Sequence, residues 1–384
     1  RDGLVLSMVG MDALKGVEGR DLYAVAGPGL VTAQFQDAVE AEGWFYGPDP
    51  SSWQECTLGG NAAANAGGPR AFKYGVTRDW VLGMEVVRAD GTVLRIGRRT
   101  RKGVTGYDLT ALIVGSEGTL GVITELTLRL VPKPEQVVTV LAALSSEADI
   151  APAIDAALRH GVWPRCVELL DAETLPVVRP ESAVPLPDAA QALLILELDG
   201  HEEDLPGPTR RLTDALDAAG ALDVQVARST REREALWSAR RKMSRTLRTL
   251  AAHKMSEDVV VPRSRVGELL RAVRGIARET GIRMPAYGHA GDGNLHVNFL
   301  WDAPEDWPRV EEGIGRLVDA VLALGGTLSG EHGIGVLKAP FLPREQSPEL
   351  IALQESIKRT FDPRGVLNPG KIFPAGAARW HGAC

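Results

Sequence analysis

The stretch Gly288-His-Ala-Gly-Asp-Gly-Asn-Leu-His296-Val-Asn-Phe299 carries the strongest structural signal in this chain. The dipeptide Asp-Gly at 292–293 is typical of the two-residue turn that closes a β-hairpin. If these two residues form the loop, His289 lies directly opposite His296, and both imidazoles are held on one face of the hairpin. The apolar residues that alternate along the second strand then face the core, namely Leu295, Val297 and Phe299.

Two imidazoles on one face can form half of a metal site, whereas a lone histidine is more often structural. A second stretch, Gly325-Gly-Thr-Leu-Ser-Gly-Glu331-His332-Gly-Ile-Gly335, offers a third ligand in Glu331. Two histidines and one glutamate suit zinc, manganese or iron(II). His332 would then be available as a general base, because histidine titrates near neutrality. The alternative is that Glu331 caps a helix and His332 is an ordinary loop residue.

Other glycine clusters indicate backbone that approaches a ligand closely. Residues 59–68, Gly-Gly-Asn-Ala-Ala-Ala-Asn-Ala-Gly-Gly, suit an anion such as a pyrophosphate, or else form a small-residue helix packed on a sheet. The turn residues at 48–52 favour the ligand. Residues 115–121 (Gly-Ser-Glu-Gly-Thr-Leu-Gly) are a weaker signal of the same kind. In Asn-Pro-Gly-Lys at 368–371, the lysine could reach a phosphate or a flavin carbonyl.

Residues 231–250 form the clearest predicted helix, because apolar residues recur there at helical spacing (Leu236, Ala239, Met243, Leu247 and Leu250). At ~100° per residue, Arg240 lies only ~40° from Leu236 on this stripe. A guanidinium at the edge of a buried stripe needs an anionic partner. That partner is either a protein carboxylate or the carboxylate of a substrate.

The remaining pattern predicts two domains that meet at Pro132-Lys-Pro134. The first contains short strands, expected at 4–9, 22–26, 81–88, 92–96 and 120–130, and a helix at 30–42. The second alternates strands at 137–144, 166–170 and 192–199 with helices at 149–160 and 209–219. That alternation is typical of an α+β sheet.

Composition limits the class of protein. The 384 residues suffice for two or three domains. No apolar run approaches the ~18–20 residues of a membrane span, and a net charge of −7 argues against nucleic acid as the main partner. The three cysteines (Cys56, Cys166 and Cys384) form no Cys-x-x-Cys pair, which excludes an iron–sulfur cluster carried by this chain. Disulfides are not expected, which suits a reducing cytoplasm.

Taken in order, these segments resemble the FAD-linked 2-hydroxyacid oxidase and dehydrogenase family within the vanillyl-alcohol-oxidase superfamily. This is the group of the glycolate oxidase flavoprotein subunit, the flavin-dependent D-lactate dehydrogenases and the D-2-hydroxyglutarate dehydrogenases. The resemblance covers nearly the whole chain. Besides the stretches above, it is carried by Cys56-Thr-Leu-Gly-Gly-Asn61, Tyr74-Gly75, Leu236-Trp-Ser-Ala-Arg240, Glu257-Asp258 with Pro262, and Phe361-Asp-Pro.

The resemblance implies an α+β fold with a PCMH-type FAD-binding domain at 1–133, a ferredoxin-like cap domain at 134–373 whose end returns to the flavin, and a tail at 374–384. It implies that His289, His296 and Glu331 bind a divalent metal and that His332 is the base. Arg240 is expected to bind the substrate carboxylate, and the other expected catalytic residues are Ser244, Lys254 and Asn298. The expected FAD-binding residues are Pro48, Asp49, Ser51, Ser52, Thr57, Gly59, Gly60, Asn61, Asn65, Gly67, Gly68, Tyr74, Gly75, Glu117, Gly118, Gly121, Ile123, Asn368 and Lys371.

The activity implied by the resemblance is oxidation of a D-2-hydroxy acid, of the D-lactate or glycolate class, to the 2-oxo acid. Hydride passes to flavin N5, and electrons then pass to a separate acceptor: a quinone, a cytochrome or an iron–sulfur subunit. The expected location is cytoplasmic, or peripheral at the membrane.

One feature of the family is missing from the sequence. The family begins with an Arg-Gly-x-Gly-Thr-type loop under the FAD pyrophosphate, and residues 1–50 contain none. We therefore expect the N-terminal part of the FAD-binding domain to be absent. The alternatives are a truncated, non-catalytic or partner-dependent subunit that does not hold FAD alone, and a protein that keeps FAD without redox turnover, as in the ether-lipid synthase relatives.

Overall fold

The computed structural model describes residues 3–182, 184–227 and 229–374. The chain divides into two compact units: the first comprises Arg1–Lys133 and Glu331–Cys384, and the second comprises Pro134–Gly330. The sequence-based division also breaks after Lys133, but it assigns residues 331–373 to the second domain, whereas the structure groups them with the first unit. Of the expected tail at 374–384, residues 375–384 lie outside the described part of the chain.

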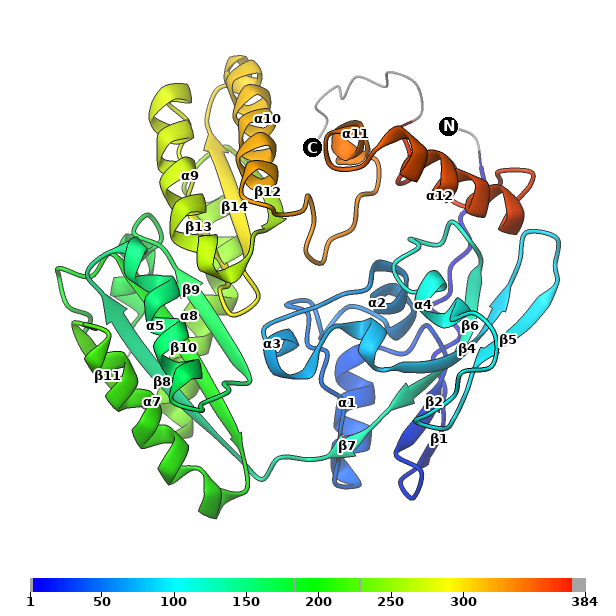
Figure 1. The fold of residues 1–384 in the computed structure, drawn as a ribbon, viewed down its shortest axis with the longest axis horizontal. Helices are drawn as coiled ribbons and strands as arrows, with labels where there is room; N and C mark the ends of the chain where they lie inside the picture. Colours follow the sequence, from blue (N-terminus) through cyan, green and yellow to red (C-terminus); the bar gives the residue numbers. More distant parts are fainter. Residues whose placement is uncertain (1–2, 183, 228, 375–384) are drawn as a thin grey trace. The chain divides into compact units, whose positions relative to one another are not determined.

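The first unit is built on a five-stranded antiparallel sheet with the strand order β1-β2-β6-β4-β5 (Figure 1). Its strands are β1 (Leu14–Glu18), β2 (Tyr23–Ala26), β4 (Val81–Val87), β5 (Val93–Gly97) and β6 (Val122–Arg129), with a separate short pair formed by β3 (Trp44–Phe45) and β7 (Val131–Pro132). Its helices are α1 (Thr32–Ala41), α2 (Leu58–Ala64), α3 (Ala71–Tyr74), α4 (Leu109–Ile113), α11 (Leu342–Glu345) and α12 (Pro348–Phe361).

The local sequence explains most elements of this unit. Leu126 and Leu128 alternate along β6 and are almost fully buried in the core, as expected for the strand at 120–130. The helix expected at 30–42 is α1, and it buries Phe35 and Val39. The strand expected at 4–9 is wrong: the first strand begins at Leu14, and the side chains of Leu4–Leu6 are exposed. An apolar run becomes a strand only where a neighbouring strand pairs with it, and within the described residues none pairs with this run.

The second unit contains a seven-stranded antiparallel sheet with the order β11-β8-β10-β9-β13-β14-β12. The strands are β8 (Gln136–Leu144), β9 (Cys166–Leu170), β10 (Ala192–Gly200), β11 (Asp223–Val226), β12 (His253–Val260), β13 (Ala286–His289) and β14 (Asn294–Trp301). The helices are α5 (Ile150–Arg159), α6 (Leu175–Val178), α7 (Pro206–Ala218), α8 (Thr230–Arg248), α9 (Val266–Thr280) and α10 (Trp307–Ala323).

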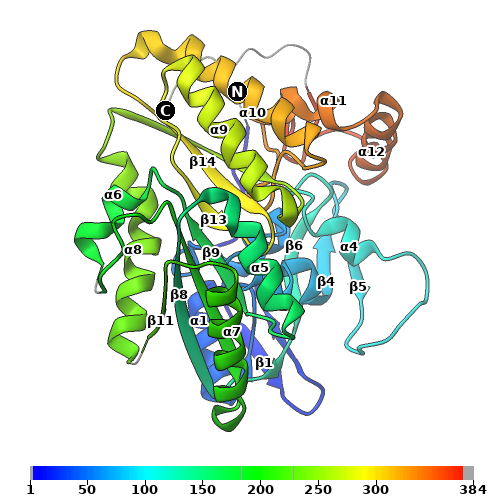
Figure 2. The ribbon, with the colours of Figure 1, turned by 60° about the vertical axis from the view of Figure 1, so that its left-hand side comes forward.

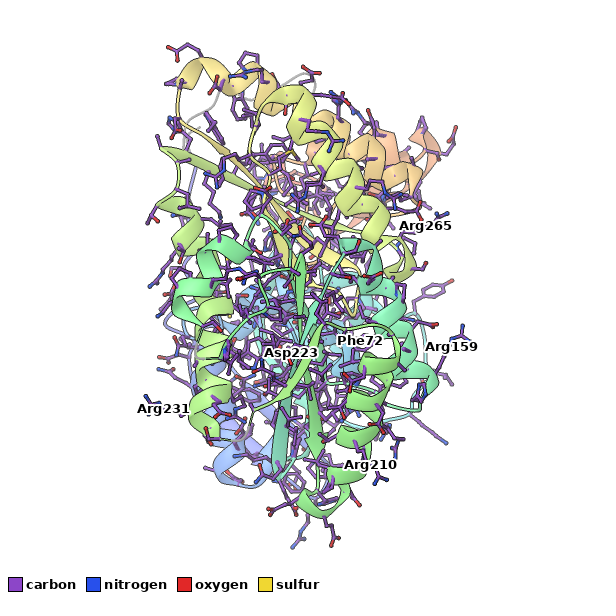
Figure 3. The ribbon with its side chains drawn as sticks, turned by 90° about the vertical axis from the view of Figure 1, so that its left-hand side faces the viewer. Phe72, Arg159, Arg210, Asp223, Arg231 and Arg265 are labelled. Atoms are coloured by element: carbon purple, nitrogen blue, oxygen red, sulfur yellow. The ribbon has the colours of Figure 1, made fainter. Side chains whose placement is uncertain are left out.

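Helices cover both faces of this sheet. Helices α5, α7, α9 and α10 lie on one face, and α8 lies on the other (Figures 1 and 2). The apolar stripe predicted for 231–250 is the packing face of α8: Leu236, Met243 and Leu247 are buried against strand residues such as Leu170. Polar side chains lie on the outer surface, where Arg159, Arg210 and Arg231 point away from the ribbon (Figure 3).

The hairpin forms, but its register differs from the prediction. His289 pairs with Asn294, and His296 pairs with Tyr287, so the loop has four residues, 290–293, instead of two. The expected pairing of His289 with His296 is therefore wrong. The reason is that Gly291 bonds to the neighbouring strand through its N–H, which reaches Val167 O at 3.2 Å, so Gly291 is not available to extend the hairpin ladder. Because the offset is two residues, both histidines still lie on the same face.

Among the residues that the structure describes, no helix combines the length and the apolar character needed to cross a bilayer. No disulfide joins the described cysteines Cys56 and Cys166. Cys384 lies outside the described residues.

Candidate functional site

Four of the glycine-rich segments meet within the first unit. The backbone N–H of Gly115 donates to Ala62 O at 2.9 Å, and that of Glu117 donates to Ala63 O at 2.8 Å, so the segment 115–121 lies against the segment 59–68. Ile372 donates its N–H to Gly335 O at 2.8 Å, which joins the chain just after the 368–371 turn to the segment 331–335. The motifs found separately in the sequence are thus neighbours in the fold.

Glu117 is the link between these loops. Its Oε1 accepts the backbone N–H of Ile334 at 2.6 Å, and its Oε2 accepts that of Gly335 at 2.8 Å. Its carbonyl oxygen accepts the side-chain amide of Asn368 at 2.6 Å. Glu117 also has a positive φ of 52°, a conformation that costs energy for a residue other than glycine. The carboxylate of Glu117, expected to serve FAD binding, therefore fixes the backbone two and three residues after His332.

The segment 58–64 is a small-residue helix, α2, as the second sequence interpretation proposed. Thr57 caps it by accepting the N–H of Gly60 at 3.2 Å, and the buried side chain of Asn61 donates to Thr32 Oγ1 at 2.8 Å. A Cβ on Gly59 would lie 2.5 Å from Pro28, and one on Gly68 would lie 2.4 Å from Asp49 O. These two glycines are needed by the packing of the protein itself, so their presence alone does not demonstrate a ligand.

All residues expected to bind FAD lie in the first unit. Several of their side chains already have protein partners. Asp49 pairs with Arg70 at 3.1 Å, and Asn65 Oδ1 accepts the N–H of Arg78 at 2.9 Å. Ile123 is buried in the core of the unit. At these positions the backbone, more than the side chain, is what remains for a cofactor.

In the second unit, a row of buried polar residues crosses the sheet face that α8 covers. His289 and His296 are 2% and 6% exposed, and their ring centroids are 5.3 Å apart with the rings nearly perpendicular. His289 Nδ1 lies 2.5 Å from Glu168 Oε1. A carboxylate on Nδ1 leaves Nε2 as the ring nitrogen that can bind a metal.

Glu168, which the sequence analysis missed, is the centre of this row. It is fully buried on β9, and its Oε2 forms an ion pair with Arg240 at 2.6 Å. Burial by itself raises the pKa of the Glu168 carboxyl, but Arg240 and His289 outweigh burial and hold this pKa below its usual range. The signal was one charged residue within an otherwise apolar strand, Cys-Val-Glu-Leu-Leu, since a buried carboxylate needs a partner.

Arg240 forms an ion pair with a protein carboxylate, which is the first of the two alternatives that the sequence left open. It also has a donor that could bind the carboxylate of a substrate, the second alternative. Its guanidinium lies over the Tyr287 ring at 4.6 Å, and it is 5% exposed. Its Nε is buried without a hydrogen-bond partner within the described residues. An arginine has five N–H donors, and a buried donor left unsatisfied is costly unless a ligand accepts from it.

Ser244 and Lys254, expected from the resemblance, are in contact. Lys254 Nζ donates to Ser244 Oγ at 3.1 Å, which links β12 to α8. Burial, together with the nearby charge of Arg248, lowers the pKa of Lys254 to about 8. Asn298 is fully buried on β14; its amide donates to His296 O at 2.9 Å, and its Oδ1 has no hydrogen-bond partner among the described residues.

Asp258 anchors the chain immediately before Glu331. Its carboxylate is fully buried and accepts from Asn294 Nδ2 at 2.6 Å, Ser329 Oγ at 2.9 Å and the N–H of Gly330 at 2.8 Å. Gly330 is the last residue of the second unit, and Glu331 is the first residue after it. Within the first unit, a Cβ on Gly67 would lie 3.0 Å from Glu331 Oε2, and His332 Nε2 lies 4.0 Å from Glu331 Oε1.

Comparison with known proteins identifies both parts of the chain. Residues 133–372 match the family described as FAD linked oxidases, C-terminal domain, and residues 1–97 match an FAD binding domain. The glycolate oxidase subunit GlcD of Bacillus subtilis is 40% identical over 379 residues, which cover 98% of this chain and 81% of that protein. A D-lactate dehydrogenase of Anaerostipes hadrus is 32% identical, with 96% of this chain and 80% of that protein covered.

A solved structure supports the fold. A p-cresol methylhydroxylase with bound substrate superposes with a TM-score of 0.77 over 97% of this chain and 80% of that chain, at 18% identity. The expected PCMH-type FAD-binding fold is confirmed by these matches.

Proposed function

Since this chain belongs to the FAD-linked oxidase family and is an FAD-linked oxidoreductase, we propose that it oxidises a small D-2-hydroxy acid to the 2-oxo acid. The relatives are named after glycolate and D-lactate, and we infer that the substrate of this chain belongs to the same class. The observation that carries the proposal is the buried guanidinium of Arg240, whose Nε–H finds no acceptor in the part of the chain that the structure describes and which is joined through Glu168 to His289.

The substrate carboxylate is bound by Arg240, with Lys254 and Ser244 as the second polar pair. A planar guanidinium suits a carboxylate because it can donate two parallel hydrogen bonds. Lys254 adds a second positive charge whose position is fixed by its hydrogen bond to Ser244. The lowered pKa of Lys254 supports an anion site. Burial and the neighbouring charge of Arg248 destabilise the ammonium group, and a bound anion would offset that cost.

FAD fits the first unit. All four segments that meet there contain glycines with positive φ, for example Gly68, Gly115, Gly335 and Gly370, so backbone without bulky side chains is available to a long cofactor. Bound FAD supplies N5 of the flavin as the acceptor of the substrate hydride. The proposed contacts are those expected from the sequence, with the backbone of 59–68 and 115–121 contributing more than the side chains.

The donor set of His289 and His296 fits a divalent metal of the zinc, manganese or iron type, and we infer that Glu331 completes it. The buried, nearly perpendicular rings and the carboxylate on His289 Nδ1 support this assignment. The position of Glu331 in the sequence supports its assignment as the third ligand. Asp258 accepts the N–H of Gly330, the residue before Glu331, and so fixes the backbone at that point. A metal held there would lower the pKa of the substrate hydroxyl.

His332 removes the proton from the substrate hydroxyl. Glu117 accepts the backbone N–H groups of Ile334 and Gly335, in the loop that carries His332. These two hydrogen bonds fix the loop and so limit the movement of the imidazole. Asn298 lies on the same sheet face as His296, and its Oδ1, which accepts no hydrogen bond from the described residues, can orient a polar group of the substrate. The electrons then leave for a separate acceptor, which we infer to be a quinone, a cytochrome or an iron–sulfur subunit.

The test is flavin reduction by substrate in His332→Ala. The flavin should remain bound, and its anaerobic reduction by D-lactate or glycolate should slow by the ~10²–10⁴-fold of a lost general base. His160→Ala is the matched control, because His160 is an exposed residue at the end of α5 and should leave the rate unchanged. A His332→Ala protein reduced at the wild-type rate would refute the role of His332.

A further inference from the structure

Within the described part of the second unit, Glu168 is the one carboxylate that contacts both His289, a proposed metal ligand, and Arg240, the proposed receptor for the substrate carboxylate. Its Oε1 lies 2.5 Å from His289 Nδ1, and its Oε2 lies 2.6 Å from the guanidinium of Arg240. We propose that Glu168 is a positioning residue that fixes His289 and Arg240 together, and so sets the spacing between the metal and the receptor for the substrate carboxylate. This inference rests on the function proposed above.

On the His289 side, Glu168 determines which nitrogen faces the site. Strand β9 places Glu168 directly in register with His289 on β13, so their contact is built into the sheet. With Nδ1–H donated to the carboxylate, the ring can rotate little, and Nε2 is the nitrogen that the ring turns toward the side of a metal. Partners of this kind orient metal-bound histidines and raise their basicity as ligands.

On the Arg240 side, Glu168 limits where the guanidinium can go. One nitrogen is paired with Glu168 Oε2, while the plane of the group lies over Tyr287. Because the ion pair with Glu168 and the contact with Tyr287 both restrain the buried guanidinium, it cannot rotate away from a bound substrate carboxylate. The buried Nε, which has no hydrogen-bond partner within the described residues, is then a donor for a carboxylate in a defined position.

The shared carboxylate matches the chemistry of a 2-hydroxy acid. In such an acid the hydroxyl and the carboxylate are on adjacent carbons, so the groups that bind them must be close together and at a constant spacing. Two receptors held by the two oxygens of one carboxylate meet that requirement. A 3-hydroxy acid separates its two groups by one more carbon and should be rejected.

Glu197 provides a matched comparison within the same sheet. It is also buried, at 3% exposure, on the neighbouring strand β10, and it also pairs with an arginine, Arg165, at 3.0 Å. Its other partners include Trp237 Nε1 at 2.6 Å, Thr139 Oγ1 at 2.7 Å and Cys166 Sγ at 3.9 Å, none of which belongs to the proposed site. If buried carboxylates on this face only stabilised the fold, replacing Glu168 and replacing Glu197 would have the same effect on metal binding.

The experiment measures zinc affinity in the full chain with FAD. Metal is removed with a chelator, and zinc is titrated back in competition with a chromophoric chelator for wild type, Glu168→Gln, Glu168→Asp and Glu197→Gln. We expect Glu168→Gln to weaken zinc binding by ~10–100-fold, the usual effect of losing such a partner. Glu168→Asp keeps the charge but is one methylene too short to reach both partners, so its affinity should lie in between. Glu197→Gln should bind zinc as wild type does.

A second readout is the substrate concentration dependence of flavin reduction. Glu168→Gln should raise the concentration of D-lactate needed for half-maximal reduction and reduce the preference for 2-hydroxy over 3-hydroxy acids, whereas Glu197→Gln should change neither.

The outcomes separate the two levels of the proposal. A wild-type protein that binds zinc, with Glu168→Gln binding it equally well, overturns the role of Glu168 and leaves the proposed function standing. A wild-type protein that binds neither zinc nor other divalent metals overturns both. Equal losses in Glu168→Gln and Glu197→Gln also overturn the inference. If Glu168→Gln does not fold, Glu168→Asp decides, and wild-type affinity in that variant overturns the role.

Discussion

Replacing Glu117 by alanine should loosen the loop that carries His332. Glu117 accepts two backbone N–H groups, from Ile334 at 2.6 Å and Gly335 at 2.8 Å. A hydrogen bond to a charged group contributes about 1.5–3 kcal/mol, so the pair would contribute about 3–6 kcal/mol if the two were additive. Because one half-buried carboxylate makes both bonds, the lower value, about 3 kcal/mol, is the better expectation. It corresponds to about a 100-fold change in the population of the open loop.

Hydrogen exchange measured by mass spectrometry tests this directly. The amides of Ile334 and Gly335 should lose about 100-fold in protection in Glu117→Ala, while the strands of the same unit keep theirs. Glu125→Ala is the control, because Glu125 pairs with Lys15 at the surface, where an ion pair contributes about 0–1 kcal/mol. Flavin reduction should slow in Glu117→Ala, since His332 lies two residues before Ile334, the first of the loosened amides. Unchanged exchange at these two amides would refute the reasoning.

Three further outcomes are expected. Because the pKa of Lys254 is about 8, its charge is lost as the pH rises through that value, so the KM for substrate should rise above pH 8 in wild type but begin high and stay flat in Lys254→Met; identical pH profiles would contradict the carboxylate role. Asp171→Asn should destabilise the second unit by about 3–5 kcal/mol in urea unfolding, because it removes the fully buried carboxylate that pairs with the partly buried Arg274 and leaves Glu147 as the one charged partner of Arg274 among the described residues; a loss below 1 kcal/mol would show that the cluster matters little. Metal removal by a chelator should slow flavin reduction without changing the flavin spectrum, and added zinc or manganese should restore it; full activity in the stripped protein would exclude a metal role.

Local pattern was enough to predict most of the fold. The strand at 166–170 and the helix at 231–250 follow from apolar periodicity, and the structure has them as β9 and α8. The hairpin around Asp292-Gly293 was also predictable, because glycine after aspartate supplies the positive φ that a tight turn needs. Its register was not, since a bond from Gly291 to Val167 on another strand decides it. No local pattern contains that partner.

The site was predictable only in part, for the same reason. Arg240 was identified because a cation within an apolar stripe stands out in one helix. Glu168 was missed because its role depends on His289, 121 residues away, and on Arg240, which reaches it from a different element. Glu117 was recognised through its glycine-rich motif, but its bond to Ile334 joins residues 217 positions apart. Side chains that act through long-range partners become visible only when the sheet order and the loop contacts are known.

The most direct test of the central claim is anaerobic flavin reduction by defined hydroxy acids. The purified protein, loaded with FAD, is mixed without oxygen with D-lactate, glycolate, L-lactate or 3-hydroxybutyrate, and the visible flavin band is followed. We predict that D-lactate or glycolate bleaches the band within the mixing experiment and yields the 2-oxo acid, while 3-hydroxybutyrate does not. A protein that holds FAD but is bleached by none of the 2-hydroxy acids would contradict the proposed function.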